Sequence, residues 1–205
     1  MGCCMVVTDA AFVHLRGIRV LNMWDCNQPT ITDAAFAHLV GIQKLCMWCC
    51  NQATLTDAAF IHLRGIRVLN MSSCPQFTDA AFVHLKGIHT LFMGLCAQPT
   101  ITDAALAHLR GIHTLVMDFC GQDNNLNITA AGLAHLVGIT NLGMHACSEE
   151  TVAAAEELGL PARREHTAFG AFDTLKEDGG EGGEVEQEGA GEAGEEGGGS
   201  GGEEQ

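Results

Sequence analysis

The sequence predicts an α/β solenoid in which each repeat adds one short strand to a parallel sheet and one short helix beside it. Two motifs, repeated in phase along most of the 205 residues, lead to this prediction. The first, Thr-Asp-Ala-Ala, begins at Thr8, Thr32, Thr56, Thr78 and Thr102 and returns in altered form at Thr129. The second, Leu-x-Met-x-x-Cys, begins at Leu21, Leu45, Leu69, Leu91, Leu115 and Leu142. A period of about 20 to 29 residues is typical of stacked strand-plus-helix units.

The leucine and methionine motif predicts the strand of each repeat. Successive side chains of a strand point to opposite faces of the sheet. Leu21 and Met23 are therefore expected to point into the core, and Val20, Asn22 and Trp24 to the opposite face. The cysteines that close the motif are expected to lie buried behind the strand exits and to donate weakly to loop carbonyls. Their spacing along the stack falls within the range for disulfides, so geometry alone leaves bridging open.

The threonine and aspartate motif predicts the helix of each repeat. Thr32 suits the N-cap position, Asp33 lies where the helix dipole favours an anion, and Gly41 lies where a left-handed residue ends the helix. The aspartates are thus interpreted as capping residues of their own helices. The buried stripe of this helix is predicted to consist of Ala35, Phe36 and Leu39. The last turns carry basic residues that complement the dipole, namely Arg16, Arg64, Lys86 and Arg110.

The two ends of the chain are expected to differ. Residues 1–160 form the predicted repeat domain, closed by a capping helix over residues 151–158 with Gly159 and Pro161 after it. Residues 161–205 are rich in Gly and Glu and are predicted to be a disordered acidic tail, because they hold too few apolar residues to form a core. Residues 1–9 align without a gap on residues 71–79. The chain is therefore expected to start inside a repeat, with an open sheet edge.

Charge and hydropathy exclude several classes of partner. The formal net charge is -15, and nucleic acid is not an expected partner because phosphate binding needs a clustered cationic surface. The sequence holds no run of about 18 apolar residues, so a membrane partner is not expected either. It also shows no signal peptide, which favours a cytoplasmic or nuclear protein whose cysteines remain thiols.

The repeats resemble the cysteine-containing leucine-rich repeats of F-box proteins. The match rests on Leu-Asn-Met-Trp-Asp-Cys at residues 21–26 and on Ile-Thr-Asp at residues 31–33. The resemblance implies a right-handed leucine-rich-repeat horseshoe with its parallel sheet on the concave face. In that family the repeats present substrates to a cullin-type ubiquitin ligase, and a separate F-box, which this sequence does not contain, docks to the ligase. The resemblance therefore implies a protein-recognition module and substrate recognition as its role.

The concave face of the sheet is the predicted partner-binding site. The two tryptophans of the chain occur in neighbouring repeats, where strands lie about 4.8 Å apart, and exposed aromatics are typical interface anchors. Alternatively, they pack sideways and only stiffen the sheet. The predicted partner-binding residues are Val20, Asn22, Trp24, Asp25, Cys46, Trp48, Val68, Asn70, Phe92, Val116, Asp118 and Phe119.

Metal, redox and enzymatic chemistry are weighed as alternatives. The helix histidines are expected to be solvated or half-buried, because packed helices lie about 8 to 10 Å apart, too far to share a zinc ion. His89 and His113 precede strands and stack without a visible third ligand, and Cys46-x-x-Cys49-Cys50 is a lone Cys-x-x-Cys. No nucleophile with a matching base is recognised, so we expect neither an enzyme nor a bound cofactor or metal. The remaining hypotheses are a truncated repeat array without a dedicated function and a cysteine-based metal or redox protein.

Overall fold

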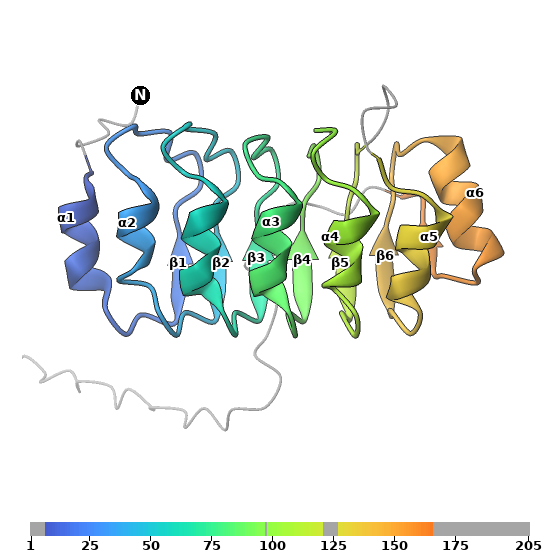
Figure 1. The fold of residues 1–205 in the computed structure, drawn as a ribbon, viewed down its shortest axis with the longest axis horizontal. Coiled ribbons are helices and arrows are strands. Elements are labelled where there is room, and N and C mark those ends of the chain that lie inside the picture. The colour runs from blue at the N-terminus through green and yellow to red at the C-terminus, as the bar shows by residue number, and fades with distance from the viewer. Residues whose placement is uncertain (1–6, 97, 121–126, 166–205) are drawn as a thin grey trace, which may run out of the picture. The chain divides into compact units, whose positions relative to one another are not determined.

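The computed structural model describes residues 7–96, 98–120 and 127–165, which belong to one compact unit spanning residues 1–174. Within these residues seven parallel strands form one sheet in chain order. Figure 1 shows the labelled strands β1 to β6 side by side in this order. This arrangement confirms the predicted α/β leucine-rich-repeat solenoid. The strands are β1 Val20–Asn22, β2 Lys44–Cys46, β3 Val68–Asn70, β4 Thr90–Phe92, β5 Thr114–Val116, β6 Asn141–Gly143 and β7 Ala162–Arg163.

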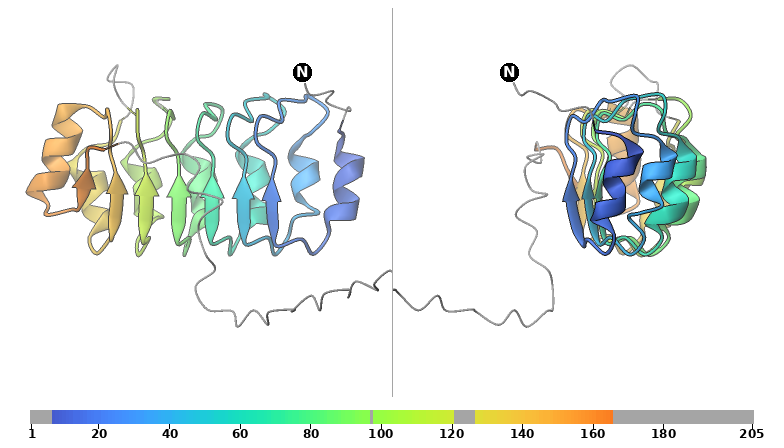
Figure 2. Two further views of the ribbon diagram at one scale, coloured as in Figure 1. Left: turned by 180° about the vertical axis from the view of Figure 1, so that it is seen from behind. Right: turned by 90° about the vertical axis from the view of Figure 1, so that its left-hand side faces the viewer.

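The helices are short and lie together on one side of the sheet (Figures 1 and 2). Several repeats have a single α-helical turn followed by a tighter 3-10 turn, and the third repeat is 3-10 throughout; such tightening is common at helix ends. The α-helices are α1 Asp9–Phe12, α2 Asp33–Phe36, α3 Asp79–Phe82, α4 Asp103–Ala107, α5 Ala130–Leu133 and α6 Glu149–Glu157. The 3-10 segments are η1 Val13–Leu15, η2 Asp57–Leu63, η3 Val83–Leu85 and η4 Ala134–Leu136.

The hydrophobic core fills the space between the sheet and the helices. Leu69 and Met71 of the third repeat and Phe82 of the next helix are fully buried there. In the second repeat Ala35, Phe36 and Leu39 are buried as predicted. Because equivalent side chains of successive repeats pack on one another, each repeat depends on its neighbours for most of its burial.

The threonine caps and helix-ending glycines follow the prediction. The Thr32 side chain accepts a hydrogen bond from the Ala34 N–H at 3.2 Å, and four later threonines make the same bond in their own repeats. Thr8 makes no such bond. Gly41 has a φ of 89°, in the left-handed region that a side chain would strain.

The aspartates bind the next repeat, which differs from their interpretation as caps of their own helices. The Asp33 carboxylate accepts hydrogen bonds from the Thr56 N–H at 2.7 Å and from the Thr56 hydroxyl at 2.6 Å. The partner lies more than twenty residues away in sequence, and the stacking of helices brings it into reach. The same two bonds join Asp9 to Thr32, Asp57 to Thr78, Asp79 to Thr102 and Asp103 to Thr129.

The C-terminal end is longer than predicted. The capping helix α6 begins at Glu149 instead of residue 151, because Ser148 takes the N-cap position and accepts a hydrogen bond from the Thr151 N–H at 3.2 Å. Beyond it, β7 pairs with β6 inside the range predicted to be disordered. Ala162 packs against the core, and Arg164 forms ion pairs with α6, which explains the order of this strand. The rest of the predicted tail, residues 166–205, and the start of the predicted partial strand, residues 1–6, lie outside the described residues.

Candidate functional site: the sheet face

The side of the sheet that points away from the helices, called the sheet face below, carries the predicted partner-binding residues in ordered columns. Parallel pairing in register aligns equivalent residues of successive repeats. One column starts at Val20 and a second at Asn22, and a third follows two residues further on at Trp24. The second column, for example, runs through Asn22, Cys46, Asn70, Phe92, Val116 and Gly143.

The two tryptophans stack on each other at the N-terminal end of the sheet face. Their ring centroids are 5.5 Å apart and the rings are inclined by 17°. The backbone N–H of Trp24 donates to the side-chain oxygen of Asn22 at 3.1 Å, and this bond holds the strand exit in place. Trp24 nevertheless keeps 58% of its surface exposed, and Val20, at the start of the same strand, keeps 44%. The sideways packing considered as an alternative is therefore present, together with a large exposed apolar surface.

The fully exposed members of the predicted set all belong to the first repeat, contrary to the expectation that the whole face is open. Val20, Asn22, Trp24 and Asp25 are exposed, and Trp48 and Phe119 are partly exposed. Asn70 and Asp118 have no exposed surface, and Phe92 and Val116 are only 2% exposed. The buried members of the predicted set are thus Cys46, Val68, Asn70, Phe92, Val116 and Asp118.

The residues at the strand exits have left-handed backbones, a feature that sequence reasoning missed. Their φ values lie between 54° and 59°, although none of them is glycine. Left-handed geometry normally costs an L-residue roughly 1 to 2 kcal/mol, so packing against neighbouring repeats must impose it. The residues are Asp25, Cys49, Ser73, Leu95, Phe119 and Ala146. Their only sequence signal is a shared position just before the cysteine of each repeat.

The repeated cysteines hydrogen-bond to the preceding repeat, as expected of buried thiol donors. The Cys50 Sγ donates to the Met23 carbonyl at 3.0 Å, and equivalent bonds join Cys74 to Met47, Cys96 to Met71, Cys120 to Met93 and Cys147 to Met117. All cysteines among the described residues are free thiols. Burial raises the pKa of Cys50 to about 12, so this thiol stays protonated near neutral pH and is a poor nucleophile.

Two cysteines of the Cys46-x-x-Cys49-Cys50 stretch lie on opposite faces of the sheet. Cys46 lies in the second column of the sheet face, whereas Cys50 lies in the core, as strand alternation predicts. No cluster of three or more His, Cys, Asp or Glu side chains suited to a metal occurs among the residues that the structure describes.

Two of the helix histidines accept hydrogen bonds from arginines of the preceding repeat. The Arg16 Nε donates to the His38 Nδ1 at 3.3 Å, and Arg64 and His84 form a similar pair at 3.4 Å. These pairs are exposed and were not foreseen, because the partners lie twenty or more residues apart. Of the four basic residues at the helix ends, Arg16, Arg64 and Arg110 each reach a histidine of the next repeat.

His89 and His113 stack at the entrances of neighbouring strands, as predicted. Their ring centroids are 4.6 Å apart and the rings are inclined by 13°. The Nδ1 of each ring lies 3.1 to 3.2 Å from the hydroxyl of the following threonine, Thr90 or Thr114. Stacking and these contacts account for the orientation of both rings.

Comparison with known proteins found solved structures of similar fold, but no matching family model and no matching curated protein. One similar solved structure is the crystal structure of the Rad7 and Elc1 complex in yeast, with 19% identity and a TM-score of 0.44 over 59% of this chain and 37% of that one. Another is the Toll–Spatzle complex of Drosophila, with 14% identity and a TM-score of 0.37 over 64% of this chain and 25% of that one. The chain thus spans less than half the length of either neighbour.

None of the helices in the described residues has the length and hydropathy of a membrane span.

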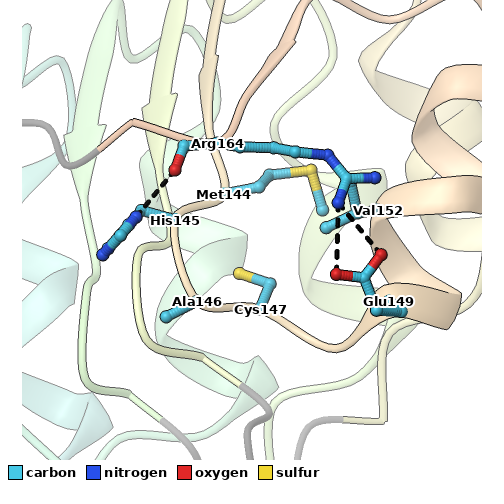
Figure 3. A pocket seen from close by; sticks show the side chains of 7 residues that line it. All are labelled: Met144, His145, Ala146, Cys147, Glu149, Val152 and Arg164. Atoms are coloured by element: carbon cyan, nitrogen blue, oxygen red, sulfur yellow. Dashed lines mark hydrogen bonds and ion pairs between the residues drawn. The ribbon is translucent and has the colours of Figure 1, made fainter.

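A hollow of about 240 Å³ lies where β6, β7 and α6 meet (Figure 3). Arg164 crosses it and pairs with Glu149 at 2.9 Å, and its second guanidinium nitrogen pairs with Glu156 at 3.1 Å. The Nδ1 of His145 lies 2.7 Å from the Arg164 carbonyl oxygen. Because these interactions hold the last strand against the capping helix, we interpret the hollow as part of the C-terminal closure of the solenoid. Its remaining lining residues are Met144, Ala146, Cys147 and Val152.

Proposed function

We propose that this chain is a protein-recognition module that binds a partner protein through the exposed N-terminal part of its sheet face. The observation that carries the proposal is the pair of stacked tryptophans, with Trp24 58% exposed. Solvent contact of so large an apolar side chain is unfavourable, and burial of it against a partner would remove that cost. Tryptophan is enriched among the residues that dominate binding energy at protein interfaces.

The residues around Trp24 have the composition of a small protein interface. Val20 adds apolar surface on the same face, and Asn22 and Asp25 place polar groups at its margin. An apolar centre with a polar rim is the usual anatomy of a binding patch. The stacking on Trp48 limits the motion of the Trp24 ring, so less conformational entropy is lost when a partner binds.

The resemblance of the repeats to those of F-box proteins supports substrate recognition for a ubiquitin ligase as the finer role. A non-enzymatic function is consistent with the chemistry of the buried cysteines, since raised pKa values make these thiols unreactive. Five thiols bonded to carbonyls, four of them buried, also suit a reducing compartment, and we propose the cytoplasm or the nucleus.

The proposal is tested by affinity capture from native lysate with the intact chain and two variants. Trp24→Ala removes the proposed anchor, whereas Val40→Ala removes an equally exposed apolar side chain elsewhere in the second repeat, where Val40 is 64% exposed. We expect a partner that the intact chain and Val40→Ala retain and that Trp24→Ala loses by at least about tenfold, as for an interface hot spot.

Tryptophan fluorescence gives a second, direct reading, because the chain holds only two tryptophans and both lie in this patch. Addition of the captured partner is expected to shift their emission to shorter wavelength as water leaves the rings. A partner retained equally by Trp24→Ala would overturn the proposed site. Empty captures with all three proteins would favour the truncated-array hypothesis, and stoichiometric zinc in the purified protein would favour the metal hypothesis.

A further inference from the structure

Acidic and basic side chains lie at opposite edges of the first five repeats. Residues 7–96 and 98–120 contain seven side chains of each kind. Every aspartate follows the end of a strand or begins a helix, whereas every arginine and lysine lies between the end of a helix and the first residue of the next strand. Because the strands are parallel and adjacent (Figure 2), the basic side chains of successive repeats come together at one edge. Asp57 and Arg64 are separated by the seven residues of η2, about 14 Å, which exceeds the screening length of about 8 Å in physiological salt.

The basic residues at the helix ends form a continuous row from the third to the fifth repeat. The row consists of Arg64, Lys86 and Arg110, all of which are exposed. It begins at the third repeat because Val40 takes the equivalent position in the second. Among the residues that the structure describes, ion pairs are formed by Arg164 alone. The three cations of the row are therefore available to carboxylates of another molecule.

Both arginines of this row are oriented by histidines of the next repeat. The Arg64 Nε donates to the His84 Nδ1 at 3.4 Å, and the Arg110 guanidinium lies 3.0 Å from the Nδ1 of His135. A ring nitrogen that accepts a hydrogen bond belongs to a neutral imidazole, so these contacts do not cancel the charge of the guanidinium. Each guanidinium has five N–H donors, and the others remain for paired bonds to a carboxylate. Because the side chains are already oriented, less conformational entropy is lost when a partner binds.

Exposed apolar side chains lie beside these cations. Ile61 is 47% exposed and Val83 is 50% exposed. Each precedes a basic residue, Arg64 or Lys86, by three positions, and residues three apart lie on the same side of a 3-10 turn. Successive helices pack about 8 to 10 Å apart, so the apolar and basic side chains of neighbouring repeats form one mixed surface. We call this surface the helix-end strip, and it consists of Ile61, Arg64, Val83, Lys86 and Arg110.

We propose that the helix-end strip binds a segment of a partner protein that combines acidic and apolar side chains. The carboxylates of the segment pair with the three cations, and its apolar side chains cover Ile61 and Val83. A nucleic acid offers phosphates to the cations but no aliphatic side chains to the apolar residues. Residues 175–205 of the chain itself are rich in Glu but contain only Leu175 and Val185 as large apolar side chains. The strip lies on the helix side, away from the sheet face, so this inference does not depend on the proposed function.

Fluorescence anisotropy with the full-length chain and labelled synthetic peptides tests the proposal. The probe is an α-helical peptide of three heptads, with one Glu and one Leu on the same face in each heptad and Ala or Gln elsewhere. Equivalent positions of successive heptads lie about 10.5 Å apart, close to the spacing of packed helices. Two matched peptides replace every Glu by Gln or every Leu by Ser. We expect the probe to bind at least about tenfold more tightly than either matched peptide, because each lacks one of the two kinds of contact.

Substitutions in the chain locate the binding surface, after circular dichroism has confirmed that every variant folds. Lys86→Glu and Val83→Ser are each expected to weaken binding of the probe at least about fivefold. The matched controls Arg163→Glu and Leu95→Ser should leave it unaltered, since Arg163 is exposed in β7 and Leu95 is 45% exposed at a strand exit. The proposal is overturned if the probe does not bind, or if the peptide without leucine binds equally tightly. Tighter binding of single-stranded RNA, or an equal effect of the control and strip variants, would also overturn it.

Discussion

The aspartate–threonine bonds between repeats make a quantitative prediction for Asp57. Its carboxylate accepts hydrogen bonds from the Thr78 N–H at 2.8 Å and the Thr78 hydroxyl at 2.6 Å. Hydrogen bonds to charged groups contribute about 1.5 to 3 kcal/mol each. Because the pair is only partly buried, we expect Asp57→Ala to lower the free energy of unfolding by about 2 to 4 kcal/mol. At about 2 to 4 °C per kcal/mol for a domain of this size, Tm should decrease by about 4 to 16 °C.

A double-mutant cycle with Thr78→Ala separates this interaction from other effects of each substitution. Urea unfolding followed by circular dichroism supplies the free energies, and the coupling between the two positions is expected to exceed about 1 kcal/mol. Thr8→Ala is the matched control, since Thr8 makes no cap bond to its helix. A coupling below about 0.5 kcal/mol, or an equal loss of stability in Thr8→Ala and Thr78→Ala, would refute the reasoning.

Three further predictions concern packing, capping and pH. Gly132→Ala should lower the free energy of unfolding by about 1 to 3 kcal/mol, because a Cβ there would lie 2.2 Å from the Asp103 Oδ1. An unchanged thermal unfolding curve would contradict this prediction. Ser148→Ala removes the α6 cap and should cost about 1 kcal/mol, measurable as a lower Tm, with Thr8→Ala as a neutral control. Burial raises the pKa of Cys50 from 9.0 to about 12 and that of Cys96 to about 11. Their contribution to the free energy of unfolding is therefore fully present below pH 9 and is lost as the pH rises towards 11 to 12. In this range each thiol lowers the free energy of unfolding by up to about 1.4 kcal/mol per pH unit. The chain has no tyrosine to titrate in that range, so a Tm that is equal at pH 8 and 10.5 under reducing conditions would contradict the prediction.

Local features of each repeat could be predicted because they depend on residues close in sequence. The alternation of Leu21 and Met23 with their neighbours defines a strand with one buried face. Thr32 caps a helix through a bond to an amide two residues away, and Gly41 takes a left-handed backbone. Repetition of these short-range signals made the solenoid predictable.

Contacts between repeats could not be predicted in the same way. Asp33 finds its partner 23 residues later, and the sequence motif is equally compatible with a bond to its own helix. Leu95 and Phe119 adopt left-handed backbones that their own side chains disfavour. The short strand β7 carries no repeat motif, and its order depends on ion pairs between Arg164 and α6.

The sequence by itself determined the repeat, its strand and helix, and the column that contains Trp24 and Trp48, because periodicity and alternation are properties of a local pattern. Only the tertiary structure decided which residues of those columns meet solvent. Val20 and Val68 occupy equivalent positions in the same column, yet the first is 44% exposed and the second 7%. Burial depends on what lies over the sheet, and that depends on the path of the whole chain in space. Strand periodicity assigns a side chain to a face, but it carries no information about what covers that face.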